Sequence, residues 1–276
     1  MNVSTLTQRQ EPERHELPAS LEALPSPVPR PVQWQRLREN LAILRGGDTT
    51  KVLDAAYSVG DSIGGMSNER HLRRMWRSKT GRELLVARPS LAEALSDHSA
   101  LAALPDQSLG HHFLRFAVRH GIDSMALLES QHAMSRDYLE LDAVRQWLSD
   151  RLTVMHDLWH VLAGYDATPS GESALMCFSL LQRVNDRALP IFILTSTVTG
   201  QIGIRDAMRG IRRGMQARYL PEQPLEEFLS QPLDQVRRAL GITPPRVSHA
   251  QMKHPDMLIP DIAARDWQRT EFAERS

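Results

Sequence analysis

A long helical pattern with a defined end constrains this chain more than any other feature. From Asp142 onward, apolar residues recur at spacings of three and four, the period of an amphipathic α-helix. Gly164 is expected to end this helix, because glycine takes the left-handed conformation at the C′ position without penalty. Thr168 and Pro169 then mark a new start, since threonine caps helices and proline is favoured at the first helical position. The short connection predicts two adjacent, antiparallel helices.

A histidine pair lies near the end of the first helix. His156 and His160 are four residues apart, so both imidazoles project from one helical face, with Cβ atoms about 5 to 6 Å apart. Asp157 falls within the same arc of about 100°, and Glu172 follows in the first turn of the second helix. Imidazole nitrogens and carboxylate oxygens are ligands of divalent cations. We therefore expect His156, Asp157, His160 and Glu172 to form one metal site.

The role of Asp157 is left open by the sequence. In H-E-x-x-H peptidases the corresponding residue is a glutamate that acts as general base. Asp157 is one methylene shorter, and Glu172 follows more closely than a third peptidase ligand usually does, so a peptidase is disfavoured. Asp157 is either a fourth metal ligand, a carboxylate that orients a histidine, or a catalytic base.

Composition excludes several classes of protein. The chain has 276 residues, enough for one large domain or two small ones. Lysine plus arginine equals aspartate plus glutamate at 33 each, so no basic excess indicates a nucleic-acid partner. Cys177 is the only cysteine, which rules out an intrachain disulfide and favours a reducing compartment. Its apolar neighbours on a predicted helix indicate a buried, unreactive thiol.

Helical periods recur along the chain, whereas alternating strand patterns, internal repeats and glycine-rich phosphate loops do not. We therefore expect an all-α fold, a single multi-helix domain over residues 33–245. Residues 1–32 are rich in proline and are expected to form a disordered tail, without a signal-peptide core or the composition of a transit peptide. Residues 246–276 are expected to form a loosely structured C-terminal tail.

An uncharged segment, residues 188–204, follows the predicted site. It is too polar and slightly too short for a membrane span, so we expect a buried helix. The alternative is the wall of a lipid pocket or a segment that touches a bilayer. The next segment has a basic face, and an apolar wall beside a basic face suits an amphiphilic anion. The arginines of this face are Arg205, Arg209, Arg212, Arg213 and Arg218.

The predicted metal site carries a resemblance to a known family. Its motif and flanks resemble the coenzyme Q biosynthesis protein Coq-four family, and the similarity extends over about residues 65–245. The residues that carry it are HDLWHVL at 156–162, Gly164, Tyr165, Gly171 and Glu172, with flanking similarity at 89–110, 185–187 and 225–245. The proline-rich N-terminal tail and Met252–Ser276 have no counterpart that we recognise.

The resemblance implies an all-helical ubiquinone biosynthesis protein with a divalent metal ion at His156, Asp157, His160 and Glu172, either zinc or a redox-active ion such as iron. It implies a pocket for a polyprenylated aromatic lipid and an oxidative decarboxylation at ring carbon C1, which replaces a carboxyl with a hydroxyl. It also implies a homodimer on a membrane surface with other ubiquinone biosynthesis proteins. Since the sequence shows no targeting signal, we expect a cytoplasmic location, peripheral on the membrane.

Two other functions are compatible with the sequence. In the first, the protein is a non-catalytic lipid-binding scaffold that organises the ubiquinone biosynthesis complex, and the metal only pins two helices together. An open coordination position facing an apolar cavity would distinguish catalysis from this role. The second is an HD-type phosphohydrolase, which requires a further histidine and aspartate at the same ion; His132 and Asp186 are available by type.

Overall fold

The computed structural model describes residues 31–46, 59, 62–63, 66–134, 138–182, 188–245 and 254–260. Within these ranges every regular element is a helix, and extended pairing is limited to two isolated bridges, Ser108 with Pro232 and Tyr165 with Leu258. The all-α fold class is therefore confirmed. Residues 1–30 of the expected N-terminal tail lie outside the described residues.

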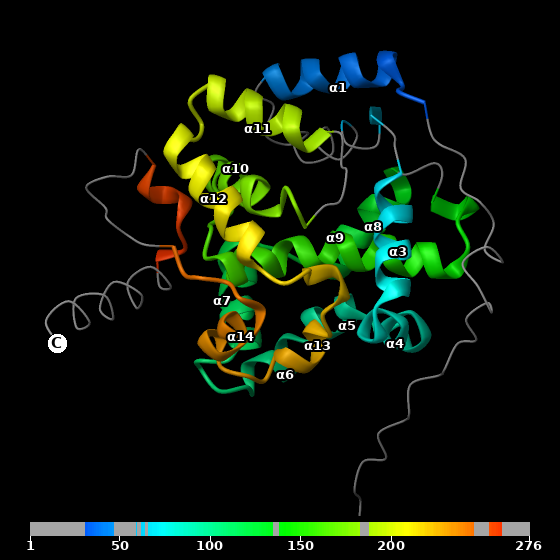
Figure 1. The fold of residues 1–276 in the computed structure, drawn as a ribbon, viewed down its shortest axis with the longest axis vertical. Helices are drawn as coiled ribbons and strands as arrows, with labels where there is room; N and C mark the ends of the chain where they lie inside the picture. Colours follow the sequence, from blue (N-terminus) through cyan, green and yellow to red (C-terminus); the bar gives the residue numbers. More distant parts are fainter. Residues whose placement is uncertain are drawn as a thin grey trace, which may run out of the picture.

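Helix α9 (Ala143–Ala163) runs through the middle of the molecule, with other helices on both sides (Figure 1). It begins where the sequence predicts, because the Asp142 side chain accepts hydrogen bonds from the backbone at Val144 and Arg145. It ends at Gly164, whose φ of 77° lies in the left-handed region that glycine favours. Its last two turns are almost fully buried, so the end of α9 lies inside the core.

Helix α10 (Pro169–Ser179) follows after a short turn and contacts α9, as predicted. The Thr168 side chain accepts a hydrogen bond from the Gly171 backbone and so caps the helix. Gly171 is required at this turn, since a Cβ atom there would lie 1.9 Å from the backbone oxygen of Asp166. Cys177 is fully buried, as expected, and burial raises the pKa of its thiol to about 12.

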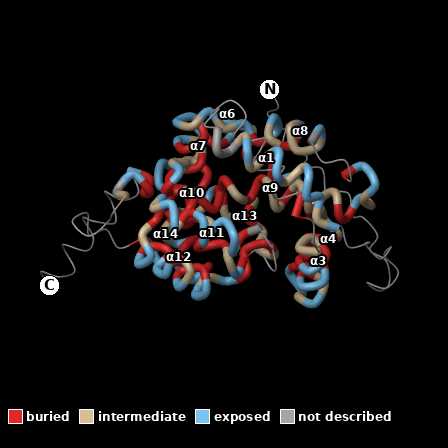
Figure 2. The backbone as a smooth tube through the Cα atoms, turned by 90° about the horizontal axis from the view of Figure 1, so that it is seen from above, coloured by how far each residue is buried: buried red, intermediate tan, exposed pale blue. Residues whose placement is uncertain are grey.

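Helices α11 (Ala188–Val198) and α12 (Ile204–Gln216) cover α10 on the outer side of the molecule (Figure 1). The expectation of one buried helix at 188–204 is wrong. The segment breaks near Gly200, and α11 exposes Ile191, Leu194 and Val198 by 59%, 65% and 77% (Figure 2). Only one side of α11 meets the core, so its apolar composition exceeds what this fold buries.

The other side of α9 is covered by short helices that share its main apolar core. They are α5 (Leu91–Ser96), α6 (His98–Ala102), α7 (Leu109–His120), α8 (Ser124–Met134), α13 (Leu225–Phe228) and α14 (Leu233–Leu240). Helices α3 (Ser67–Arg77) and α4 (Lys79–Ala87) form a smaller apolar cluster with Val144 and Leu148, at the start of α9. The remaining elements are α1 (Trp34–Gly46) and the 3-10 turns Tyr138–Glu140, Leu220–Glu222 and Pro255–Met257.

Two buried arginines bind the backbone at the end of α9. Nε and Nη2 of Arg237 donate to the carbonyl oxygens of Leu162 and Val161, at 2.9 and 3.2 Å. Nη2 of Arg213 donates to the carbonyl oxygen of Ala163 at 2.6 Å. The last carbonyls of a helix lack partners within the helix and carry its negative dipole end. The two guanidinium groups satisfy these carbonyls and fix the turn that leads to α10.

The C-terminal boundary of the domain needs a correction. Residues 254–260, expected to lie in a loose tail, pack against α10 and the α9–α10 turn. Met257, Leu258 and Ile259 are buried, and Ile259 donates its backbone N–H to the carbonyl of Gly164. Residues 246–253 and 261–276 lie outside the described part of the chain. Within that part, no helix combines the length and apolar character needed to cross a bilayer.

Candidate metal centre

The predicted donor side chains come together at the junction of α9 and α10. The carboxylate of Glu172 lies 3.3 Å from Nε2 of His156 and 3.1 Å from Nε2 of His160. The two imidazole rings are 5.0 Å apart at their centroids, and the planes are nearly perpendicular at 86°. One carboxylate therefore joins two consecutive turns of α9, as the spacing of the residues predicts.

The hydrogen bonding of His160 fixes which of its nitrogens faces the cluster. Nδ1 lies 3.0 Å from the carbonyl oxygen of Tyr165, which can only accept, so Nδ1 carries the hydrogen. In the neutral ring Nε2 is then an acceptor that faces the carboxylate of Glu172, another acceptor. A proton or a cation between the two atoms resolves this opposition. The same arrangement, with the second nitrogen donating to a carbonyl, is typical of metal-bound histidines.

Asp157 is the third residue of α9 in the cluster. One ligand atom each from His156, Asp157 and His160 lie within 4.8 Å of one another. Asp157 is buried, and burial raises the pKa of its carboxyl despite the two histidines beside it. A buried carboxyl with a raised pKa is suited to taking up a proton, and its position also allows it to act as a ligand.

The ionisable groups of the cluster shift one another's pKa values in opposite directions. Burial alone would raise the pKa of Glu172, yet the imidazoles of His160 and His156 hold it well below its ordinary value. Burial alone would lower the pKa of His160, but Glu172, Asp157 and the Tyr165 carbonyl together raise it. The Glu172 side chain is 37% exposed, whereas His160 is buried. The cluster therefore attracts positive charge and is open to solvent at Glu172.

The surroundings of His160 include contacts that spacing along the chain did not indicate. Phe116 of α7 stacks on the His160 ring, with centroids 5.2 Å apart. His120, one turn further along α7, lies 2.6 Å from the carboxylate of Asp166 in the α9–α10 turn. No local motif links these residues, because α7 and the turn are distant in the sequence. The fold brings them together and holds the His160 ring in place.

The geometry fits a divalent cation. Two ligands that each lie about 2.0 to 2.1 Å from a tetrahedral zinc ion are about 3.3 to 3.4 Å apart. The separations of Glu172 from the two histidine nitrogens, 3.3 and 3.1 Å, are close to this value. Two nitrogen and two carboxylate donors suit zinc or iron better than magnesium or calcium, which prefer oxygen ligands. Metal binding itself stays a prediction.

The arrangement does not favour the phosphohydrolase alternative. Nε2 of His132 lies 2.7 Å from the carboxylate of Asp150, and its ring stacks on Tyr138. His132 is thus engaged with the start of α9 and is not a member of the histidine–carboxylate cluster. Asp186, the other residue that this alternative requires, lies outside the described residues.

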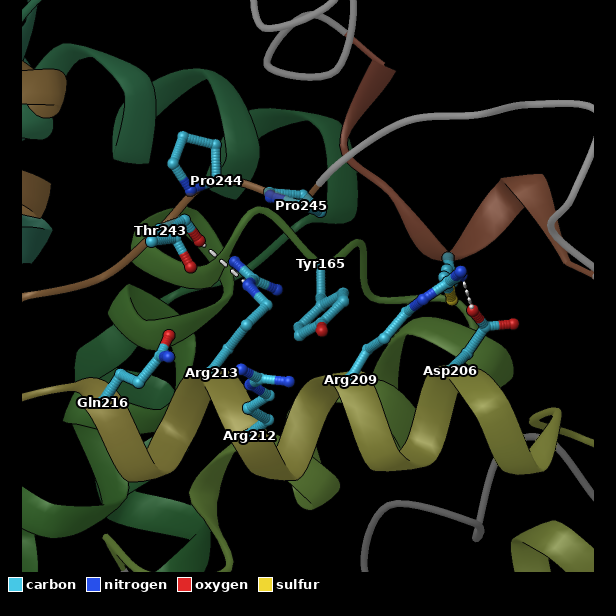
Figure 3. A pocket seen from close by; sticks show the side chains of 10 residues that line it. Tyr165, Asp206, Arg209, Arg212, Arg213, Gln216, Thr243, Pro244 and Pro245 are labelled. Atoms are coloured by element: carbon cyan, nitrogen blue, oxygen red, sulfur yellow. Dashed lines mark hydrogen bonds and ion pairs between the residues drawn. The ribbon is translucent and has the colours of Figure 1, made fainter.

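A cavity of about 450 Å³ lies beside Tyr165, between α12 and residues 243–245 (Figure 3). Three arginines line it and no residue of the metal cluster does, so it is not the apolar cavity expected at that cluster. That apolar cavity stays a prediction. The lining residues are Tyr165, Asp206, Arg209, Arg212, Arg213, Gln216, Thr243, Pro244, Pro245 and Met257.

The fold and the cluster together define a class: an all-helical protein in which two histidines and an aspartate of one helix lie close together and a glutamate of the next helix contacts both histidines. Comparison with known proteins identifies the family. The model of coenzyme Q (ubiquinone) biosynthesis protein Coq4 matches residues 50–246, more than half of the chain. The chain belongs to this family, which confirms the resemblance seen in the sequence.

Individual relatives agree with this assignment. The COQ4 homolog of Nematostella vectensis is 25% identical over 206 residues, 70% of this chain and 93% of the relative. The COQ4 homolog of Danio rerio is 28% identical over 204 residues, 71% of each chain. Both are named ubiquinone biosynthesis proteins and mitochondrial, and no finding supports the cytoplasmic location that we expected.

One crystal structure supports the fold. A Nostoc punctiforme protein, described as a ubiquinone biosynthesis protein, superposes with a TM-score of 0.53 at 20% identity. The match covers 76% of this chain and 96% of that chain. At this level of identity the similarity shows a shared helical fold.

Proposed function

We propose that this protein acts in ubiquinone biosynthesis by holding a divalent metal ion at His156, Asp157, His160 and Glu172. Its substrate is a polyprenylated hydroxybenzoate, and its reaction is the oxidative decarboxylation at ring carbon C1 that replaces carboxyl with hydroxyl. Family membership supports the pathway. The contact of one Glu172 carboxylate with both histidine nitrogens supports the metal site and carries the proposal.

Each residue of the cluster has a distinct role in this proposal. His160, fixed by the Tyr165 carbonyl and the Phe116 ring, would hold the ion through Nε2, the nitrogen that faces Glu172. Glu172 balances the positive charge and, being partly exposed, lies where a substrate enters. Asp157, buried beside both histidines, would serve as the catalytic base. When bound, a divalent ion supplies a Lewis acid for the head oxygen, and a redox-active ion is needed if dioxygen reacts there.

The experiment is product formation by purified protein. Protein isolated without chelator or nickel affinity resin is first analysed for metal, and a prenylated hydroxybenzoate is then supplied with dioxygen. We expect decarboxylated, hydroxylated product by mass spectrometry, lost in His160→Ala and kept in His98→Ala, which removes an exposed histidine outside the cluster. Metal-loaded, folded protein that forms no product would contradict the enzymatic role.

A non-catalytic scaffold is the second candidate, and the exposed apolar side chains of α11 favour it. In this alternative the protein binds polyprenylated lipid and assembles with other ubiquinone biosynthesis proteins as a homodimer at a membrane surface, with α11 as part of the contact. Leu194→Gln should then weaken membrane or partner association without changing metal content. If His160→Ala leaves pathway flux in cells unchanged while Leu194→Gln abolishes it, the scaffold is the better account.

A further inference from the structure

We propose that the cavity between α12 and residues 243–245 is a binding site for a phosphate monoester. It goes beyond the function proposed above, because no residue of the histidine–carboxylate cluster lines this cavity. The proposal rests on the charge of the walls, on one buried guanidinium with an unused donor, and on the size of the cavity.

The walls carry a net positive charge. Arg209, Arg212 and Arg213 come from consecutive turns of α12, and the Tyr165 ring lies between the side chains of Arg209 and Arg213 (Figure 3). Asp206 is the one acidic residue of the lining, and its carboxylate accepts from Nη1 of Arg209 at 3.0 Å. Three guanidinium groups against one carboxylate leave two positive charges, which match a phosphate monoester dianion.

Arg213 supplies the most specific observation. Its side chain is only 8% exposed, Nε donates to the Thr243 carbonyl at 2.9 Å, and Nη2 donates to the Ala163 carbonyl. Its third nitrogen, Nη1, is buried and has no hydrogen-bond partner among the described residues. A buried charged donor without a partner destabilises the fold, because it has lost its hydration and gained no protein acceptor. An anion in the cavity that Arg213 lines would provide an acceptor for this group.

The other arginines are available at the rim. Arg212 is exposed and has no hydrogen-bond or ion-pair partner in the part of the chain that the structure describes. Arg209 is half exposed and binds Asp206 through one nitrogen, which leaves further donors for a ligand. Guanidinium groups donate through a planar fork that matches the oxygens of phosphate. One buried and two exposed arginines along the same cavity therefore suit capture of a phosphate from solvent or from a surface.

The cavity is larger than a phosphate group alone. Its volume of about 450 Å³ falls in the usual range for small-molecule sites of about 300 to 1,000 Å³. Pro244, Pro245, Met257 and the Tyr165 ring form the less polar part of the lining. The ligand is therefore a phosphate carried on a small organic body. The body belongs either to a soluble phosphate ester or to the head group of a lipid.

Calorimetric titration with inorganic phosphate and with glycerol 3-phosphate tests the soluble source. Flotation with phosphatidylcholine vesicles, with and without phosphatidic acid, tests the lipid source. The key variant is Arg209→Gln/Arg212→Gln, which keeps the structural bonds of Arg213. The matched control is Arg205→Gln, an exposed arginine of the same helix outside the cavity lining. His160→Ala, which removes the metal cluster, is tested in parallel.

We expect saturable binding that is weaker by about tenfold or more in the double variant, since each charge-assisted bond contributes about 1.5 to 3 kcal/mol. Arg205→Gln and His160→Ala should bind as the wild type does, even if the proposed metal function fails. Binding of glycerol 3-phosphate identifies a soluble ligand, and binding only to phosphatidic acid vesicles identifies a lipid head group. Absence of binding to inorganic phosphate, glycerol 3-phosphate and phosphatidic acid vesicles alike, an unaffected double variant, or an equal loss in Arg205→Gln overturns the proposal.

Discussion

At the scale of single residues, Glu172 is the group on which the candidate metal site depends. Its carboxylate lies 3.3 and 3.1 Å from the two histidine nitrogens, and it reaches them from a different helix. Its contacts hold its own pKa below the ordinary value and help raise that of His160. Substitutions of Glu172 should therefore change both the metal affinity and the stability of the protein, and the two effects can be measured separately.

Glu172→Ala removes one oxygen donor and the charge that balances the cation. Since even residues that only support metal ligands change affinity by about 10- to 100-fold, we expect a loss of at least this size. Metal content and competition with a chromogenic chelator measure it. Glu93→Ala, which removes an exposed glutamate from the first turn of α5, is the control and should keep full metal content. Unchanged metal affinity in Glu172→Ala would remove Glu172 from the ligand set.

The contact between Glu172 and His160 predicts a pH dependence of stability in the metal-free protein. The lowered pKa of Glu172 stabilises the fold above pH 4.5, the ordinary pKa of a glutamate, and this contribution is lost as the pH falls. The raised pKa of His160 stabilises the fold below pH 6.5, the ordinary pKa of a histidine, and this contribution is lost as the pH rises. The difference in free energy of unfolding between wild type and Glu172→Gln should therefore be largest between 4.5 and 6.5. Urea denaturation across pH measures it, and a flat difference would contradict the pairing.

At the scale of elements, the end of α9 and the turn to α10 set the geometry of the site. Their local signals, Asp142, Gly164 and Thr168, could be read from the sequence because a cap is defined by neighbouring residues. The arginines that bind the last carbonyls of α9 could not, since Arg237 is 75 residues away from Leu162. The exposure of α11 was also missed, because composition does not reveal how much of a helix its neighbours cover.

Arg237→Met tests the role of these backbone contacts. Arg237 is 2% exposed, and its loss leaves the carbonyls of Val161 and Leu162 without these donors. We expect the free energy of unfolding to fall by about 2 to 4 kcal/mol, from unsatisfied buried acceptors. Arg238→Met, at the exposed neighbouring position, should change it by less than about 0.5 kcal/mol. Equal effects of the two substitutions in urea denaturation would show that the carbonyl contacts contribute little.

At the scale of the whole molecule, one all-helical core carries the site. Residues 254–260, from much later in the sequence, pack against α10 of this core. The all-α class, the bounds of α9 and the start of α10 followed from periodicity and capping. The packing of residues 254–260 could not be predicted in this way. The segment is too short to show a helical period, so nothing in the sequence indicated that Met257, Leu258 and Ile259 are buried. The same limitation hid the contacts of Phe116 and Asp166 around the site, which come from separate parts of the chain.

Truncation tests this view of the C-terminal boundary. Ending the chain after residue 260 should leave thermal stability nearly unchanged, because the buried residues 257–259 are kept. Ending it after residue 245 removes three buried apolar side chains, each contributing about 1.5 to 3 kcal/mol, and should lower the melting temperature by several degrees or more. Differential scanning calorimetry of both forms measures it. Equal melting temperatures would show that residues 254–260 do not belong to the folded domain.

The central claim is that α9 and α10 pool their donors around a single cation. Crystals of the protein saturated with zinc, measured at the zinc absorption edge, test it directly through anomalous scattering. We predict one strong anomalous peak within bonding distance of Nε2 of His156, Nε2 of His160 and the carboxylate of Glu172. A peak elsewhere, or none at this junction despite saturating zinc, would contradict the account.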